Sequence, residues 1–372
     1  MTSMRTALAC ALLVALSPLV AAAQDIPVAV VGPITGQDAA FGEQMKRGAE
    51  MAVQDIDAHG GVLGKQLKLS IGDDACDPKQ AVAVANQMAN NNVVMVAGHF
   101  CSGASIPASS VYAENGIIQI SPASTNPLLT DGAAKNGWTN VFRTCGRDDA
   151  QGRVAGTYLA EHFKGKPVAI VQDKTAYGKG LADETKKAIN AAGMKEALYE
   201  SVNQGDKDFS ALVSKMKEAK IAAIFYGGYF TEAGLLIRQA KEQGLDAVLM
   251  GGDALASEEY WKITGDTGQK TLMTFSPDPR NMPTAQAAVA AFRAQGYDPE
   301  GYTLYTYAAL QVFAQAAAKA NSLKADAVAK ALRANKFDTV IGSIGFDAKG
   351  DVIGPDYVVY VWQNGKYAEI KG

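Results

Sequence analysis

Short apolar segments alternate with longer amphipathic segments along most of the chain. The first series of apolar runs occupies residues 28–31, 67–71, 93–97 and 117–120. A second series occupies residues 168–171, 197–202, 222–226, 247–250 and 272–275. The stretches between them have helical periodicity, as at residues 42–58, 183–192 and 209–219. Apolar strands divided by helices are typical of parallel sheets covered on both faces, so the pattern predicts an α/β fold with two doubly wound lobes.

The last part of the chain departs from this alternation. Two adjoining helical patterns at residues 304–320 and 325–335 precede strand-like runs at 341–346 and 357–362. These elements are too few for a third lobe, so we expect them to complete the two existing sheets.

The chain must then pass between the lobes three times. We place these crossings near Thr144, Phe275 and Phe346. The predicted first lobe comprises residues 24–143 and 276–345, and the predicted second lobe comprises residues 144–275 and 346–372. The length of 372 residues agrees with two lobes, because a single core rarely exceeds about 250–300 residues.

The first 23 residues have the features of a secretory signal peptide. Arg5 precedes an apolar run that Pro18 interrupts, and the run ends in small residues at positions 21–23. We predict cleavage after Ala23 and export to the periplasm. Retention as a membrane span and lipid attachment at Cys10 are the disfavoured alternatives, since Ala7 stands where a lipoprotein signal requires Leu.

Composition narrows the choice of partner. After the predicted cleavage, 34 basic residues face 38 acidic residues, so the sequence has no excess of positive charge for a nucleic acid or an anionic membrane. No nucleotide-binding fingerprint occurs, and the three histidines are scattered without metal-ligand spacing. We expect neither a cofactor nor a metal, nor an enzymatic activity, and take the partner to be a small molecule.

Three cysteines remain after the predicted cleavage, and an odd number in an exported protein suggests one pair and one free thiol. Cys76 and Cys101 each follow a predicted strand in successive βα units, so the two can meet at one sheet edge. We predict a Cys76–Cys101 disulfide.

The loops that follow the predicted strands are rich in small, hydroxyl-bearing and aromatic residues. They contain Ser102, Thr125, Tyr177 and the segment 226–229, and Asp253 ends another strand. Hydroxyl and backbone N–H groups at helix N-termini can bind a carboxylate, and an acidic side chain can bind an ammonium group. The pattern favours a zwitterionic ligand between the lobes; alternatively, Ser102 and Thr125 only cap helices.

The mature chain resembles the periplasmic leucine/isoleucine/valine-binding proteins, which are solute receptors of ABC transporters with the type I periplasmic-binding fold. The resemblance is most specific at residues 30–36 (VVGPITG), 73–82 (DDACDPKQAV), 98–102 (GHFCS), 205–210 (GDKDFS) and 226–229 (YGGY). It implies a monomeric receptor that closes on an amino acid and delivers it to an inner-membrane permease. It also implies the same disulfide and leaves Cys145 free, packed near a crossing.

The resemblance implies a role for each residue of the site. Ser102 and the backbone N–H of Thr125 would hold the ligand carboxylate. The Ala123 carbonyl, the Thr125 hydroxyl and Asp253 would hold the ammonium group. Five aromatic residues would complete the site, with Tyr177 and Tyr229 closing over the ligand and Phe41, Phe100 and Tyr302 lining the side-chain pocket.

Two positions depart from the pattern of that family. Asp253 stands where branched-chain receptors have Glu, and Phe100 stands where an aliphatic residue is usual. A shorter carboxylate and a bulkier ring leave open a broader receptor for alanine, proline, valine or 4-aminobutyrate. A ligand-sensing module of a regulator is the alternative from another functional class, because fold alone does not separate transport from sensing.

Overall fold

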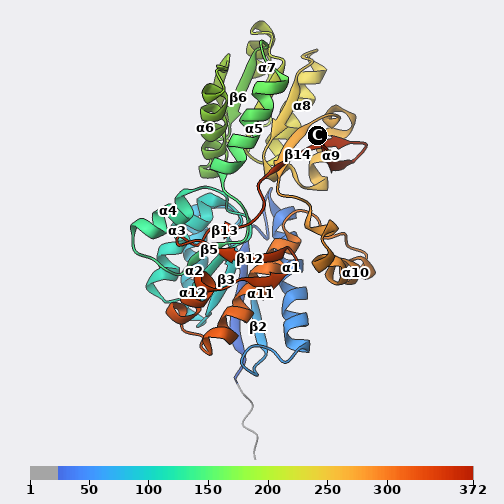
Figure 1. The fold of residues 1–372 in the computed structure, drawn as a ribbon. Helices are drawn as coiled ribbons and strands as arrows, with labels where there is room; N and C mark the ends of the chain where they lie inside the picture. The colour runs from blue at the N-terminus through green and yellow to red at the C-terminus, as the bar shows by residue number, and fades with distance from the viewer. Residues whose placement is uncertain (1–23, 372) are drawn as a thin grey trace, which may run out of the picture.

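The computed structural model describes residues 24–371, and the predicted signal peptide lies outside these residues. The chain forms two lobes, each built around one sheet, with several connecting segments between them (Figure 1). Here the first lobe means the sheet of strands β1–β5 with its helices, and the second lobe means the sheet that contains β6–β10. This architecture confirms the predicted α/β fold.

The first-lobe sheet is entirely parallel and has the order β2-β1-β3-β4-β5. Its strands are β1 (Ile26–Gly32), β2 (Leu67–Asp73), β3 (Met95–Gly98), β4 (Ile118–Ser121) and β5 (Val141–Arg143). One face packs against α1 (Ala39–Ala58), α11 (Thr303–Ala320) and α12 (Ala325–Ala334). The other packs against α2 (Pro78–Asn90) and α3 (Ser102–Glu114), with α4 (Leu128–Lys135) beside α3. Residues of β3 and β4 are buried throughout; β3 has an unbroken apolar run, whereas β4 also buries the polar residues Gln119 and Ser121.

The second lobe repeats this arrangement. Its parallel strands are β6 (Val168–Gln172), β7 (Leu198–Ser201), β8 (Ala223–Gly227), β9 (Val248–Gly251) and β10 (Leu272–Phe275), in the order β7-β6-β8-β9-β10. Helices α5 (Asp148–His162) and α6 (Ala176–Ala191) pack together on one face. Helices α7 (Ser210–Glu218), α8 (Phe230–Glu242) and α9 (Glu258–Thr264) lie on the other. The strand order of both lobes therefore reverses beside their first strand, between β1 and β3 and between β6 and β8.

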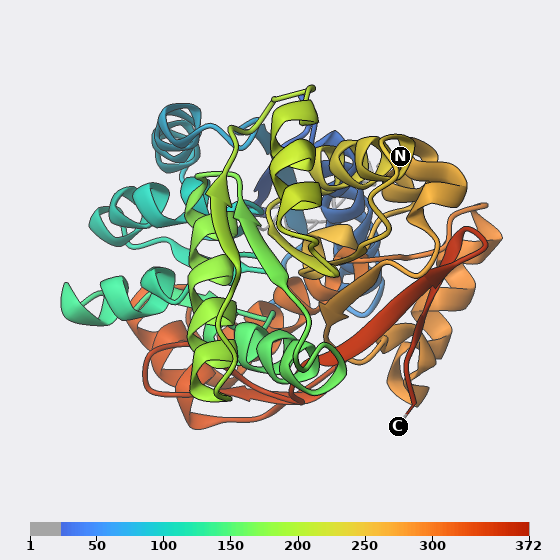
Figure 2. The same ribbon diagram turned by 90° about the horizontal axis from the view of Figure 1, so that it is seen from above.

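The C-terminal part of the chain completes only one of the two sheets. Strands β14 (Val358–Gln363) and β15 (Lys366–Glu369) extend the second-lobe sheet as an antiparallel hairpin at its edge (Figure 2). Strands β11 (Phe337–Thr339), β12 (Gly342–Phe346) and β13 (Val352–Ile353) instead form a separate antiparallel sheet, so the expectation for the first-lobe sheet was wrong. Helix α10 (Gln286–Ala294) follows the second crossing.

The helix that follows β6 begins earlier than the sequence pattern suggested. It starts at Ala176 because the hydroxyl group of Thr175 caps it, accepting a hydrogen bond from the backbone N–H of Gly178 at 2.9 Å. Tyr177 therefore lies in the first turn of α6 and not in a loop. The helix fixes the direction of this side chain, whose hydroxyl group donates a hydrogen bond to the Asp253 carboxylate of the same lobe.

The disulfide prediction is confirmed. Cys76, in the turn after β2, is bonded to Cys101, the residue before α3, with 5.5 Å between their Cα atoms. Cys145 is free and buried. The bond joins the strand-to-helix loops of two successive βα units, at the edge of the sheet that faces the second lobe.

We predict that replacing both Cys76 and Cys101 by Ser lowers the free energy of unfolding by about 3 kcal/mol. The residue separation of 25 sets this magnitude, because the bond restricts the unfolded chain. Urea unfolding of the oxidised protein measures the difference. A double variant as stable as the parent would contradict the prediction, and Cys145→Ala provides a variant that leaves the disulfide intact.

Candidate functional site

The carboxyl ends of the two sheets face each other, and their loops meet between the lobes. In open α/β sheets, ligands bind beyond these strand ends, where the strand order reverses. The segments after β3 and β6 carry Phe100, Ser102 and Tyr177, and those after β8 and β9 carry Tyr229 and Asp253. A small cavity lies at their meeting point, lined by Phe100, Ser102, Ala123, Tyr177, Tyr229, Asp253, Ala254 and Tyr302.

The first lobe contributes a site suited to an anion. Ser102 is the first residue of α3, where the backbone N–H groups have no acceptor within the helix. Its side-chain oxygen accepts a hydrogen bond from the backbone N–H of Asn126 at 3.2 Å. Thr125 is fully buried, and its hydroxyl group has no hydrogen-bond partner among the described residues. Neither residue is a helix cap, since Cys101 precedes α3 and Pro127 precedes α4.

A buried arginine holds the loop that carries Ala123 and Thr125. The Arg143 guanidinium group donates hydrogen bonds to the carbonyl groups of Ser124 at 2.7 Å and Asn126 at 3.1 Å. Its Nε lies 2.7 Å from the Asp351 carboxylate. The arginine therefore fixes the backbone on both sides of Thr125, with its charge balanced by Asp351, which directly precedes β13.

The second lobe contributes the acidic group. Asp253 begins a short 3-10 helix, Asp253–Leu255, and only 2% of its surface is exposed. Its carboxylate accepts a hydrogen bond from the Tyr177 hydroxyl group at 2.7 Å and another from the Tyr302 hydroxyl group. Tyr302 precedes α11 in the first lobe, so this second bond joins the two lobes.

Burial controls the electrostatics of this site. It raises the pKa of the Asp253 carboxyl group, and the hydroxyl groups of Tyr302 and Tyr177 oppose that rise by donating to the charged form. Burial also raises the pKa of Asp148, which lies at the start of α5. None of the described residues that line the cavity is Lys, Arg or His. The site therefore has an excess of acidic groups and suits a ligand with a positive group.

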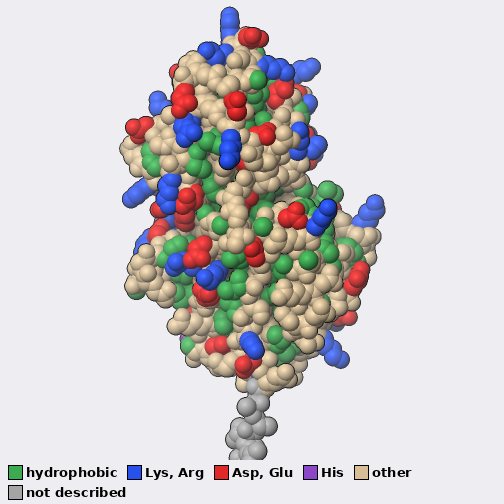
Figure 3. Space-filling model, turned by 180° about the vertical axis from the view of Figure 1, so that it is seen from behind, with side chains coloured by type: hydrophobic (Ala, Val, Ile, Leu, Met, Phe, Trp, Pro, Cys, Tyr) green, Lys and Arg blue, Asp and Glu red, His purple; other side chains and the backbone are tan. Residues whose placement is uncertain are grey.

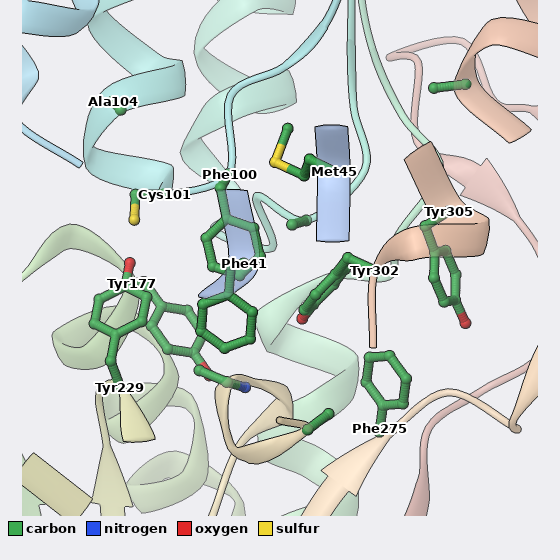
Figure 4. Packing of buried hydrophobic residues seen from close by; sticks show 14 of the residues in the cluster. Phe41, Met45, Phe100, Cys101, Ala104, Tyr177, Tyr229, Phe275, Tyr302 and Tyr305 are labelled. Carbon is green, nitrogen blue, oxygen red and sulfur yellow. The ribbon is translucent and has the colours of Figure 1, made fainter. Parts of the chain in front are cut away.

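Aromatic rings form the wall of the cavity on the first-lobe side. Phe41 and Phe100 are stacked with their centroids 4.3 Å apart, and the Tyr302 ring meets Phe100 edge-on at 5.0 Å. Figure 4 shows the two stacked rings with Tyr177 and Tyr229 on one side and Tyr302 on the other. Phe230 of the second lobe packs edge-on against Phe41 at 5.3 Å. This apolar wall crosses the boundary between the lobes.

All nine residues singled out from the sequence are buried at this boundary. Seven of them line the cavity. Phe41 lies behind Phe100, and Thr125 lies in the same loop as Ala123. Sequence reasoning missed three residues at this boundary, namely Phe230, Arg143 and Gln44. The side-chain oxygen of Gln44 accepts a hydrogen bond from the backbone N–H of Tyr302 at 2.9 Å. The available signals were the position of Phe230 directly after Tyr229 and a polar Gln44 on the buried face of α1.

The cavity is nearly closed, with a volume of about 10 Å³. That space holds about one water molecule, so a larger ligand enters only when the lobes separate. A second cavity of about 290 Å³ lies among the crossings and is lined by residues including Cys145, Tyr305 and Tyr357. The segments that follow β5 and β10 line this second cavity, and the segments after β3, β6, β8 and β9 do not.

The histidine nearest the site has no free ring nitrogen for catalysis. His99 is fully buried, with its Nδ1 2.6 Å from the Asp74 carboxylate and its Nε2 2.9 Å from the Tyr112 hydroxyl group. His59 bonds the carbonyl group of Asp55 at the end of α1, in agreement with a capping role. Both rings therefore have structural partners.

Two facing α/β lobes with a buried polar and aromatic site between their strand ends are typical of bilobal ligand-binding proteins. The model of the periplasmic binding protein family matches residues 25–366, and the chain belongs to this family. No helix among residues 24–371 is both long enough and apolar enough to cross a membrane. Charges of both signs are dispersed over the face of the two lobes seen in Figure 3.

Named relatives cover almost the whole chain. Leu/Ile/Val-binding protein homolog 1 of Brucella melitensis is 50% identical over 342 residues, which are 92% of this chain and 91% of the relative. The leucine-, isoleucine-, valine-, threonine-, and alanine-binding protein of Pseudomonas aeruginosa is 45% identical over 346 residues, with coverages of 92% and 91%.

Solved structures show the same fold. The branched-chain amino acid transporter substrate binding protein of Streptococcus pneumoniae in complex with isoleucine has a TM-score of 0.82 at 27% identity, covering 94% of this chain and 100% of that one. A substrate-binding protein of Desulfitobacterium hafniense in complex with Leu has a TM-score of 0.77 at 30% identity, covering 93% and 100%.

We predict that Arg143→Ala lowers the free energy of unfolding by about 2–4 kcal/mol, because it leaves the Ser124 and Asn126 carbonyl groups buried without a donor. Asp351 loses one of its ion pairs and keeps the one to Arg147 at 2.7 Å. Chemical denaturation measures this loss. The matched control is Arg153→Ala, which removes an ion pair between exposed side chains and should change stability by less than about 1 kcal/mol. Equal effects of the two substitutions would contradict the role assigned to Arg143.

Proposed function

We propose that this protein is a periplasmic receptor that binds branched-chain aliphatic L-amino acids between its lobes and delivers them to an ABC permease of the inner membrane. The observation that carries the proposal is the buried Asp253 carboxylate opposite the free N-terminus of α3. This pairing of an anionic and an electropositive group across one cavity matches the two charges of an amino acid. The names of the Brucella and Pseudomonas relatives support the choice of ligand.

The ligand carboxylate would bind at the first lobe. The Ser102 hydroxyl group and the N–H groups of Ser102 and Thr125 supply donors, and the α3 dipole favours negative charge there. The ammonium group would bind the Ala123 carbonyl, the Thr125 hydroxyl and Asp253. The ammonium group satisfies the charge of Asp253, which among the described residues has hydrogen-bond donors but no cationic partner.

The aliphatic side chain would lie against the aromatic wall. Phe41, Phe100 and Tyr302 provide apolar surface in the first lobe, while Tyr177 and Tyr229 cover the ligand from the second. Burying such a side chain contributes about 1.5–3 kcal/mol. Because the ligand contacts groups of both lobes, it binds the closed state better than the open one and so shifts the population toward closure.

Several details of the receptor belong to the same proposal. The protein works as a monomer without catalysis, and its leader is removed after Ala23. The first two crossings lie near residues 144 and 275. Strand β13 pairs with β12, so we place the third crossing after Ile353 and not at the predicted Phe346.

A second candidate ligand class is that of smaller amino acids. The Phe100 ring fills space beside Ser102, and the closed cavity is small. The Pseudomonas relative is named for threonine and alanine as well as the branched-chain amino acids. Titration with leucine, isoleucine, valine, alanine, proline and 4-aminobutyrate ranks the candidates.

Calorimetric titration tests the main proposal. We expect leucine, isoleucine and valine to bind, and Asp253→Asn to weaken leucine binding at least about 30-fold, since breaking a buried charge pair costs about 2–5 kcal/mol. The control is Asp246→Asn, which removes a fully exposed carboxylate of the second lobe and should leave the affinity unchanged. Unchanged affinity in Asp253→Asn, or no heat with any aliphatic amino acid, would contradict the proposal.

Phe100→Leu tests the aromatic wall. The smaller side chain enlarges the pocket, so we expect the affinity for leucine to rise relative to that for alanine. The ratio of the two dissociation constants, measured for both proteins in the same buffer, is the readout. If the alanine dissociation constant divided by the leucine dissociation constant falls or stays the same, the Phe100 ring does not limit the size of the ligand.

A further inference from the structure

A second group of acidic residues lies between the lobes, outside the ligand cavity. Asp38 precedes α1 and Asp74 follows β2 in the first lobe, while Asp173 follows β6 and Glu232 lies in the first turn of α8 in the second. Each of these side chains is at most 3% exposed. The group therefore loses its water where the two lobes meet.

Hydrogen bonds join the lobes directly at this group. The Gln37 side-chain amide donates to Glu232 Oε1 at 3.0 Å, and the Gln204 amide donates to Asp38 Oδ2 at 3.1 Å. The backbone N–H of Gly205 also donates to Glu232 Oε1, at 2.7 Å. Gln37 and Asp38 of the first lobe thus bond Glu232 and Gln204 of the second, and opening of the lobes must break these two hydrogen bonds.

The remaining oxygen atoms of the group are unsatisfied. Three buried carboxylate oxygens have no hydrogen-bond partner among the described residues, namely Asp38 Oδ1, Asp173 Oδ2 and Glu232 Oε2. None of these three carboxylates forms an ion pair within residues 24–371. A buried carboxylate without a donor or a cation is costly when charged, and protonation supplies the missing donor.

Among the residues that the structure describes, no cationic group acts on Asp38 to offset this cost. Asp74 is paired with His99, and the neighbouring Tyr226 hydroxyl group is itself unpartnered. The Lys174 ammonium group is bonded to Asn203 at an exposed position. The sulfur atoms of Cys76 and Cys101 lie within 4.8 Å of the Asp38 carboxylate, and their disulfide neither titrates nor binds a metal. Tyr229 faces the group from the start of α8.

Burial and the neighbouring charges raise the pKa of two members of the group, Asp38 and Asp173. Burial, followed by the charges of Glu232, Asp173 and Asp74, raises the pKa of Asp38 to about 8. Burial also raises the pKa of Asp173 to about 6. When the lobes separate, Asp38 regains water and moves away from Glu232 and Asp173, which returns its pKa toward the ordinary value of about 4.

We propose that closure of the lobes takes up a proton at Asp38, so that the protein captures its ligand more tightly in mildly acidic than in mildly alkaline surroundings. The effect on ligand capture rests on the receptor function proposed above. The proton-linked closure itself rests only on the contact between the lobes.

The direction follows from the two protonation states. Below both pKa values Asp38 is protonated in the open and closed forms, and closure is not penalised. Between the two values, closure must bind a proton, and the affinity falls by up to about tenfold per pH unit as pH rises. Above about pH 8 the carboxylate is charged in both forms, and the full penalty on closure remains.

Calorimetry in buffers of different ionisation enthalpy counts the protons taken up when leucine binds. At about pH 7 we expect the wild-type protein to take up as much as one proton more per leucine than Asp38→Asn, which mimics the protonated acid in shape. The control is Glu50→Gln. It removes an exposed carboxylate from α1, the helix that follows Asp38, and the variant should behave as the wild type. Equal proton uptake by the wild type and Asp38→Asn would overturn the proposal.

Small-angle X-ray scattering without ligand separates this inference from the proposed function. We expect the wild-type protein to have a smaller radius of gyration at about pH 5.5 than at about pH 8.5, and this difference to shrink in Asp38→Asn. If leucine gives no heat but this pattern holds, the choice of ligand fails and the proton-linked closure stands. If the difference is absent, or the same in Asp38→Asn, the proton-linked closure is wrong.

Discussion

Closing the lobes removes acidic side chains from water, and the rest of the site depends on how that cost is met. Asp253 is buried with two tyrosine hydroxyl groups as donors, one from each lobe, and within residues 24–371 no basic residue lines its cavity. A buried pair is favourable only when both charges are present. In the proposed function the ligand ammonium would supply the second charge, so the same electrostatic deficit would select an amino acid and favour closure when it is bound.

The scaffold supplies this geometry through its repeated strand order. Both sheets reverse their order beside their first strand, and both reversals face the boundary between the lobes. Arg143 fixes the loop that carries Ala123 and Thr125, and the disulfide joins the segment after β2 to the start of α3. The loop and helix start that the proposal assigns to the ligand carboxylate are thus tied to the first lobe, while Asp253 and Tyr177 belong to the second.

The apolar runs predicted the parallel strands of both lobes except β5 (Val141–Arg143), and the small hydroxyl-bearing loops after them indicated Ser102, because local patterns determine these features. The sequence could not place Arg143 or Gln44, since their partners lie far away in the chain. The sequence also did not predict the separate sheet of β11–β13, because the hydrophobic pattern of three short strands does not indicate which sheet they join. The assignment of ligand-binding roles to the nine buried residues remains a prediction.

A crystal structure of the protein grown with L-leucine tests the central claim most directly. The account predicts a closed cleft with the leucine ammonium nitrogen within hydrogen-bond distance of the Asp253 carboxylate, about 2.7–3.2 Å, and the leucine carboxylate at the start of α3. A leucine bound with its ammonium group away from Asp253, or bound outside the cleft between the lobes, would contradict the account.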